Sequence, residues 1–89
     1  MPLTPDHRHR CWFVVTPVGS RWQVDFGHVG RPYLYSTQDE ALVIARSAAK
    51  LHWEDRREPS GALLDLPGEP RHVVATYGRV PHLVRARAG

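Results

Sequence analysis

Three side chains near the start of the chain have the types and spacing of a metal site. His7, His9 and Cys11 alternate in an H-x-H-x-C run, and imidazole nitrogens with a thiolate are ligands that zinc, nickel and copper accept. A structural zinc site needs four ligands in fixed positions. Because the histidines precede the first apolar segment and Cys11 opens it, we favour a structural thiol beside two solvated histidines, with no metal and no cofactor.

Cys11 is also the single thiol that could act as a nucleophile. Such a nucleophile needs a neighbouring base that a third group orients. The sequence contains no G-x-S-x-G turn, paired-carboxylate pattern or phosphate-cradling glycine loop, and we interpret Gly27-His28-Val29-Gly30 as a hairpin connection. We therefore expect no catalytic residue and no enzymatic activity.

Arginine side chains are the next candidates, since eleven of the twelve basic residues are arginine and the net charge is +3. Arginine recognises phosphate well, although the same bias arises in proteins encoded by GC-rich genomes. Binding of nucleic acid is thus one hypothesis, strengthened if Tyr33 and Tyr35 face away from the helix and can stack on bases. The arginines near the two ends of the sequence are Arg8, Arg10, Arg79, Arg85 and Arg87.

The composition is that of an ordinary soluble domain, with 42% apolar and 24% charged residues in 89 positions. No apolar run approaches the ~20 residues that span a bilayer, and residues 1–10 lack the apolar stretch of a secretory signal. We expect a cytoplasmic, bacterial-type protein that does not associate with membranes. The predicted organisation is a flexible arm (1–10), one domain (11–78) and a basic tail (79–89).

Two apolar hairpins are expected, one on each side of a helix. The first joins strands 11–16 and 21–26 through a turn at 17–20, and a third short strand over 31–36 is expected at an edge because it contains Pro32. In the second strand one face is apolar and the other polar, which predicts a sheet covered on one side. The apolar residues Trp22, Val24 and Phe26 alternate there with Arg21, Gln23 and Asp25.

The helix has the clearest local signals. Thr37 followed by Glu40 is typical of a capping box, with Ser36 as the alternative cap. Small apolar residues then recur at helical spacing and predict a helix from about Gln38 to Trp53 that lies close to the sheet. The residues of this stripe are Ala41, Leu42, Ile44, Ala45, Ala48 and Ala49.

After the helix, breakers at Pro59-Ser60-Gly61 predict a loop, and strands 62–66 and 72–77 follow around a turn at 67–70. The predicted fold is α+β: an antiparallel sheet of four to five strands in ββ(β)αββ order, with one helix on one face.

Several motifs in this order resemble the bacterial domains grouped as DUF2188, a family of unknown function. The resemblance spans Trp12 to Pro81. It implies a fold, and it implies no catalytic residue, cofactor or partner. The residues that carry it are Trp22-Gln23-Val24, Tyr35-Ser36-Thr37-Gln38-Asp39-Glu40-Ala41, Ala45, Ala49 and Thr76-Tyr77-Gly78.

Self-association is the leading functional hypothesis. Either Trp12 or Phe13 must point away from the helix, and a strand with apolar residues on both faces exceeds what a one-sided sheet needs. The outward aromatic residue of this strand would belong to an apolar patch larger than a monomer usually exposes. The other members of the patch would be Tyr33 or Tyr35, Val43 and the apolar residues of the tail. A homodimer through the face or the edge of the sheet would cover it, and a different protein partner is the alternative.

Overall fold

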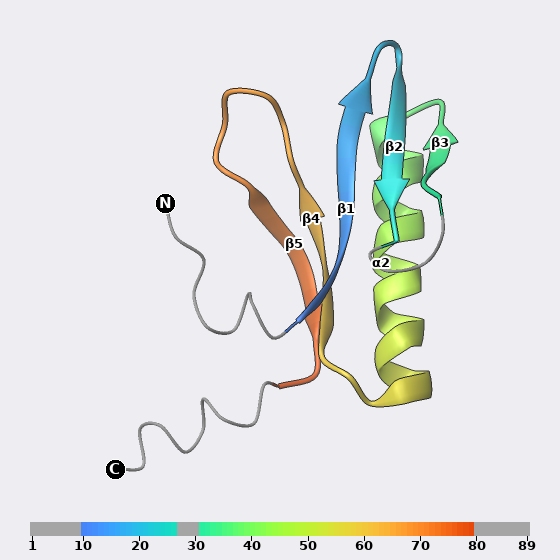
Figure 1. Cartoon of the computed structure of the whole chain (residues 1–89), viewed down its shortest axis with the longest axis vertical. Helices are drawn as coiled ribbons and strands as arrows, with labels where there is room; N and C mark the ends of the chain where they lie inside the picture. The colour runs from blue at the N-terminus through green and yellow to red at the C-terminus, as the bar shows by residue number, and fades with distance from the viewer. Residues whose placement is uncertain (1–9, 27–30, 80–89) are drawn as a thin grey trace.

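The computed structural model describes residues 10–26 and 31–79, and it contains a helix or strand at each place where the sequence predicts one (Figure 1). The arm before Arg10, the connection at 27–30 and the tail after Arg79 lie outside the described residues. The α+β class is confirmed. The elements are β1 (Cys11–Val18), β2 (Arg21–Asp25), β3 (Tyr33–Tyr35), α2 (Gln38–Arg56), β4 (Ser60–Leu64) and β5 (His72–Tyr77).

The sheet has the strand order β3-β2-β1-β4-β5 and is mixed, so the prediction of a wholly antiparallel sheet was wrong. The central strands β1 and β4 are parallel, with Phe13 opposite Ala62, whereas the other neighbours are antiparallel. The cause is the connection from β3 through α2 to β4. A helix that covers a sheet returns the chain to its starting end, so the strands before and after the helix run in the same direction.

β1 continues two residues further than predicted, to Val18, because the turn is tighter than expected. Gly19 has φ +61 and Val18 pairs with Arg21, which leaves Gly19-Ser20 as a two-residue connection. Pro17 lies within the strand, opposite Trp22. It is tolerated there because the pairing of β1 with β4 stops at Val15, so β1 has a strand on one side only at Pro17.

The N-cap of α2 at Thr37 is confirmed, while the reciprocal bond to Glu40 comes from the residue before the cap. The Thr37 hydroxyl accepts a hydrogen bond from the Glu40 amide at 3.1 Å, and the Glu40 carboxylate accepts one from the Ser36 amide at 3.3 Å. The helix ends at Arg56, three residues later than predicted, and Arg57 then adopts the left-handed conformation with φ 55. Residues 54–56 extend the helix because glutamate and arginine are good helix formers.

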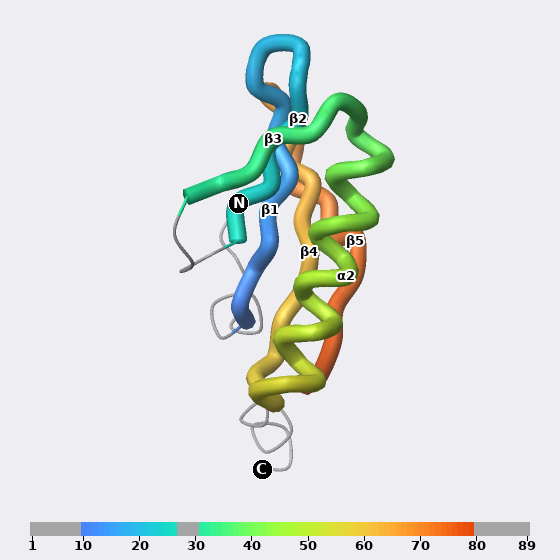
Figure 2. The backbone as a smooth tube through the Cα atoms, turned by 90° about the vertical axis from the view of Figure 1, so that its right-hand side faces the viewer, coloured from blue at the N-terminus to red at the C-terminus, as the bar shows by residue number. Residues whose placement is uncertain are grey.

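The core lies between α2 and one face of the sheet, as Figure 2 shows from the side. Alanines on α2 let the helix approach the strands closely, and Trp22 packs against the margin of this core. The fully buried Ser60 satisfies its hydroxyl by donating to the carbonyl of Ala49. The buried apolar residues of this layer are Phe13, Val15, Val24, Ala41, Ala45, Ala49 and Ala62.

Candidate functional site

The face of the sheet opposite α2 is the largest candidate surface, because no described element lies on it (Figures 1 and 2). Strand alternation assigns its side chains: Phe13, Val15 and Val24 face the helix, so their neighbours along each strand point the other way. We call this surface the open face. Its residues are Trp12, Val14, Thr16 and Val18 of β1; Arg21, Gln23 and Asp25 of β2; Leu34 of β3; Gly61 and Leu63 of β4; and Val73 and Thr76 of β5.

The sequence left open whether Trp12 or Phe13 faces away from the helix, and the structure places Trp12 on the open face. Phe13 is 5% exposed in the core, whereas Trp12 is half-buried. The indole of Trp12 lies against Gly61 of β4, so close that a Cβ on Gly61 would come within 2.5 Å of the ring and 2.8 Å of the Ala75 carbonyl oxygen. Gly61 is therefore required for this contact.

The open face has an apolar centre that extends to exposed aliphatic residues. Leu63 is 1% exposed although it is not among the core residues against α2. Val18, Leu34 and Val73 are each about half exposed, at 45%, 50% and 46%. They lie at the end of β1 and on the two edge strands β3 and β5, so exposed aliphatic side chains occur on both sides of the open face.

Charged residues of both signs border this apolar centre. Arg21 and Asp25 lie on β2 and are exposed. On the other side, Arg71 pairs with Asp65 at 3.4 Å just beyond the ends of β5 and β4. The border therefore carries no excess of positive charge, unlike a surface that binds a phosphate backbone.

Both edges of the sheet are protected against pairing with another strand. β3 has three residues and follows Pro32, which has no amide hydrogen to donate. β5 contains an irregularity where the partner of Ala62 is Ala75 but the partner of Leu63 is Val73. Short strands, proline and bulges are the usual means of blocking edge pairing, so the face is the better candidate than either edge.

Among the arginines predicted to bind nucleic acid, Arg10 is held by the protein itself. Its Nη1 donates to the carbonyl oxygens of Ser60, Tyr77 and Gly78 at 3.1, 3.0 and 2.9 Å. These hydrogen bonds join the start of β1 to the end of β5. Arg10 and Arg79, which are far apart in the sequence, therefore lie at the same end of the sheet. Arg8, Arg85 and Arg87 lie outside the described residues.

Tyr33 and Tyr35, which the sequence offered as base-stacking residues, are not on the open face. They pair with Val24 and Trp22, whose side chains point toward α2. Tyr35 packs against the core, and the exposed Tyr33 ring lies 5.3 Å from the ring of Phe26. Base stacking on the open face would therefore depend on Trp12.

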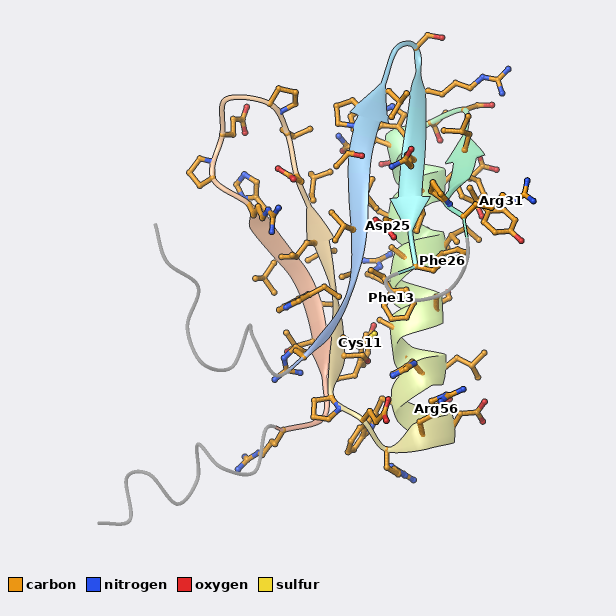
Figure 3. All side chains as sticks on the ribbon, in the orientation of Figure 1. Cys11, Phe13, Asp25, Phe26, Arg31 and Arg56 are labelled. Atoms are coloured by element: carbon orange, nitrogen blue, oxygen red, sulfur yellow. The ribbon has the colours of Figure 1, made fainter. Side chains whose placement is uncertain are left out.

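A shallow pocket of about 230 Å³ lies between the C-terminal half of α2, β1 and the end of β2. In Figure 3, Phe13 and Phe26 lie beside each other at this position, and Arg56 lies further along the helix. The pocket contains one buried polar ring, that of His52, which contacts Glu58 at 2.9 Å. Its lining residues are Phe13, Phe26, Ala48, Leu51, His52, Asp55 and Arg56.

The environment of Cys11 does not activate its thiol. Burial raises the pKa of Cys11 above its ordinary value, the Glu58 carboxylate raises it further, and the Arg56 guanidinium lowers it. A raised pKa reduces the thiolate fraction at neutral pH, which is the reverse of what a catalytic cysteine needs. Within residues 10–26 and 31–79, no three His, Cys, Asp or Glu side chains are grouped so that they could hold a metal ion.

No described helix combines the length and the apolar character needed to cross a bilayer. No family model, no curated protein and no solved structure matches the chain. The resemblance to DUF2188 therefore stays a prediction, and the candidate site is defined by its own residues.

Proposed function

We propose that the protein is a non-enzymatic binding module that associates with itself through the open face, in its simplest form as a cytoplasmic homodimer. The observation that carries the proposal is the combination of the half-buried Trp12 with the exposed Val18 and Val73 on a face that no described element covers. Removing such apolar surface from water contributes roughly 25 cal/mol per Å². A second copy would supply the missing layer.

The charge of the domain supports a protein partner over nucleic acid. The described residues contain nine arginine or lysine side chains and eight aspartate or glutamate side chains, so their net charge is close to zero. Nucleic acid binding depends on an excess of basic residues that release counterions from phosphates. Most of the excess in this chain comes from Arg85 and Arg87, because Asp6 offsets Arg8 at the start of the sequence.

Nucleic acid binding is the second candidate function, and one observation favours it. The contact of Arg10 with Gly78 brings Arg10 and Arg79 together at one end of the sheet. Arg56 acts electrostatically on Cys11, next to Arg10, and so lies at the same end. Glu58, whose carboxylate also acts on Cys11, reduces the positive potential there.

The dimensions of the face set the expected affinity. Strands spaced ~4.8 Å apart with ~3.3 Å per residue give five strands a footprint of roughly 20 by 20 Å, on the order of 400 Å². A stable complex of standard size buries ~800 Å² per partner. We therefore expect a reversible dimer with a dissociation constant in the micromolar range or weaker.

Sedimentation velocity from low micromolar to millimolar concentration tests the proposal. Val73→Arg should shift the protein toward monomer, because it places a charge on an exposed apolar position of the open face, on the edge strand β5. The matched control is Val43→Arg, since Val43 is 50% exposed against 46% for Val73 but lies on α2. This control should associate as the unchanged protein does.

Two results would refute self-association through the open face: a monomer at all concentrations, or equal weakening by both substitutions. A parallel series with single- and double-stranded DNA tests the second candidate. Co-sedimentation of a monomer with DNA that disappears as salt is raised would favour nucleic acid binding instead.

A further inference from the structure

We propose that the pocket beside α2 binds a small zwitterion that carries one aromatic ring, such as a free aromatic amino acid. The ring would lie between Phe26 and Leu51, and the charged head group would lie at Asp55 and Arg56. The pocket is on the helix side of the sheet, so this inference goes beyond self-association through the open face and does not depend on it.

The helical wall of the pocket is a single stripe of α2. Its five residues follow the spacing i, i+3, i+4, i+7 and i+8, which places side chains on one face of a helix. The stripe begins with apolar side chains and ends with two opposite charges, so a ligand that lies along it meets an apolar surface at one end and charges at the other. The residues of the stripe are Ala48, Leu51, His52, Asp55 and Arg56.

Aromatic rings line the apolar end of the pocket. The ring centroids of Phe13 and Phe26 lie 6.0 Å apart with an interplanar angle of 56°, and the two rings are beside each other in Figure 3. The His52 ring lies 5.9 Å from Phe13, nearly perpendicular to it. Aromatic groups prefer such inclined arrangements, and Leu51 is 58% exposed beside them. A ligand ring at this place would therefore contact other rings and cover an exposed leucine.

The volume of the pocket limits the ligand to one ring. An engineered apolar cavity of ~150 Å³ in another protein binds benzene, so about 230 Å³ holds a benzene ring with a short substituent. Pockets for drug-sized ligands are larger, at ~300 to 1,000 Å³. Phenylalanine and tyrosine are therefore closer to the right size than compounds with several rings.

The charges at the other end of the pocket match a zwitterion. Asp55 and Arg56 are exposed, and within the part of the chain that the structure describes neither side chain forms a hydrogen bond or ion pair. Adjacent residues of a helix do not face each other, so the two charges stay separate. A guanidinium can donate two parallel hydrogen bonds to a carboxylate, and Asp55 can accept from an ammonium group. Glu58 is already in contact with His52 at 2.9 Å.

The distance between the two ends suits an α-amino acid. Leu51 and Asp55 are four residues apart on the helix, which is about 6 Å at ~1.5 Å per residue. In an aromatic α-amino acid, bonds of ~1.5 Å place the amino nitrogen about 5 Å from the ring centroid. A ring packed on Leu51 therefore brings the head group to the level of Asp55 and Arg56.

A titration with phenylalanine and three analogues tests the ligand class. An open pocket and a ligand of about a dozen heavy atoms predict a dissociation constant in the millimolar range, which amide chemical shifts of isotope-labelled protein can measure. Phenylalanine should shift the amides of Phe26 and of residues 48–56 and approach saturation. Phenethylamine lacks the carboxylate and 3-phenylpropionate lacks the ammonium, so each should bind about 1.5- to 5-fold more weakly. Alanine lacks the ring and should not saturate.

Substitutions at the apolar end test the location of the ring. Leu51→Gln should weaken phenylalanine binding by about 3- to 10-fold, because it removes apolar surface from the pocket. The matched control is Val43→Gln, since Val43 is also half exposed on α2, at 50%, but does not line the pocket. Both positions are exposed, and circular dichroism verifies that the variants fold.

Substitutions at the charged end test the two pairings separately. Asp55→Asn should remove the advantage of phenylalanine over 3-phenylpropionate, because the ammonium loses its partner. Arg56→Gln should remove the advantage of phenylalanine over phenethylamine, because the carboxylate loses its partner. Glu54→Gln is the control, since Glu54 is an exposed acidic residue of α2 outside the pocket, and it should leave all affinities unchanged.

Three results would overturn the inference. The first is the absence of amide shifts with phenylalanine up to its solubility limit. The second is binding of phenethylamine and 3-phenylpropionate as tight as that of phenylalanine, because the charged end would then have no role. The third is equal weakening by Leu51→Gln and Val43→Gln, which would place the ligand elsewhere. None of these results bears on self-association, which sedimentation measures without ligand.

Discussion

The packing of Trp12 on Gly61 gives a quantitative prediction for Gly61→Ala. The added Cβ would lie 2.5 Å from the Trp12 ring and 2.8 Å from the Ala75 carbonyl oxygen. The ring can rotate away only by giving up its contact with β4, and the carbonyl belongs to the backbone of β5. Either adjustment separates groups that are packed in the native sheet.

The expected cost follows from two opposing effects. Overpacking by one methyl group typically costs ~1 to 3 kcal/mol, whereas replacing glycine restricts the unfolded chain and returns ~0.4 to 1 kcal/mol. The net loss in the free energy of unfolding should be about 1 to 2 kcal/mol. This is a substantial part of the roughly 4 to 13 kcal/mol available to a domain of this size.

Urea unfolding followed by far-ultraviolet circular dichroism measures this loss, and a double-mutant cycle assigns it to the ring. In a Trp12→Leu background the indole is absent, so Gly61→Ala should cost less there than in the unchanged protein. A Gly61→Ala protein as stable as the unchanged one would refute the reasoning. An equal cost in both backgrounds would show that the ring is not responsible.

Three further predictions concern the other layers of the fold. Trp22→Ala should lower the free energy of unfolding by ~3 kcal/mol in urea titrations, because it removes a large side chain at the margin of the core; an unchanged midpoint would contradict its place there. Arg10→Ala should lower the free energy of unfolding by about 1 to 3 kcal/mol, because three carbonyl oxygens lose their donor. Hydrogen exchange measures where the stability is lost: backbone amides should exchange faster only at the ends of β4 and β5 that contact Arg10. Cys11 should react with iodoacetamide more slowly than free cysteine at neutral pH, because burial and Glu58 raise its pKa. Its reaction rate should increase only at a higher pH than that of free cysteine. Equal rates for Cys11 and free cysteine would contradict the raised pKa.

Features that depend on neighbouring residues could be predicted from the sequence. The cap formed by Thr37 and Glu40 and the burial of Ala41, Ala45 and Ala49 require only the helical period and a short hydrogen-bonded pattern. The two hairpins required only their turn residues and apolar runs. In each case the partners are close in the sequence, so their spacing alone specifies the contact.

Features that depend on distant residues were predicted less well. The parallel pairing of β1 with β4 was missed, although a helix joining two strands of one sheet is the usual sign of parallel strands. Gly61 was interpreted as a loop breaker, yet it is buried in β4 beneath Trp12. A glycine at the start of an apolar strand can mark such a close approach, but only the fold reveals which side chain makes it.

The candidate site shows the same division. Alternation in β2 already placed Arg21, Gln23 and Asp25 opposite the helix, so part of the open face was visible in the sequence. The orientation of Trp12 was not visible in the sequence, because Trp12 and Phe13 are adjacent apolar residues of one strand. In the structure Phe13 lies opposite Ala62 and packs against α2, so Trp12 points to the open face. The interaction of Arg10 with three carbonyls has no local sequence signal.

The parallel pairing of β1 and β4 also has a consequence for how the chain folds during synthesis. The strands are separated by about 50 residues, so at ~5 to 20 residues per second the ribosome needs roughly 3 to 10 seconds after making β1 to deliver its central neighbour. In that interval residues 14–18 of β1 can pair with β2, but Trp12 and Phe13 lie outside this pairing and the other side of β1 has no strand to pair with. The same apolar strand that completes the native sheet is therefore the segment on which chaperones, or a second nascent chain, have the longest time to act.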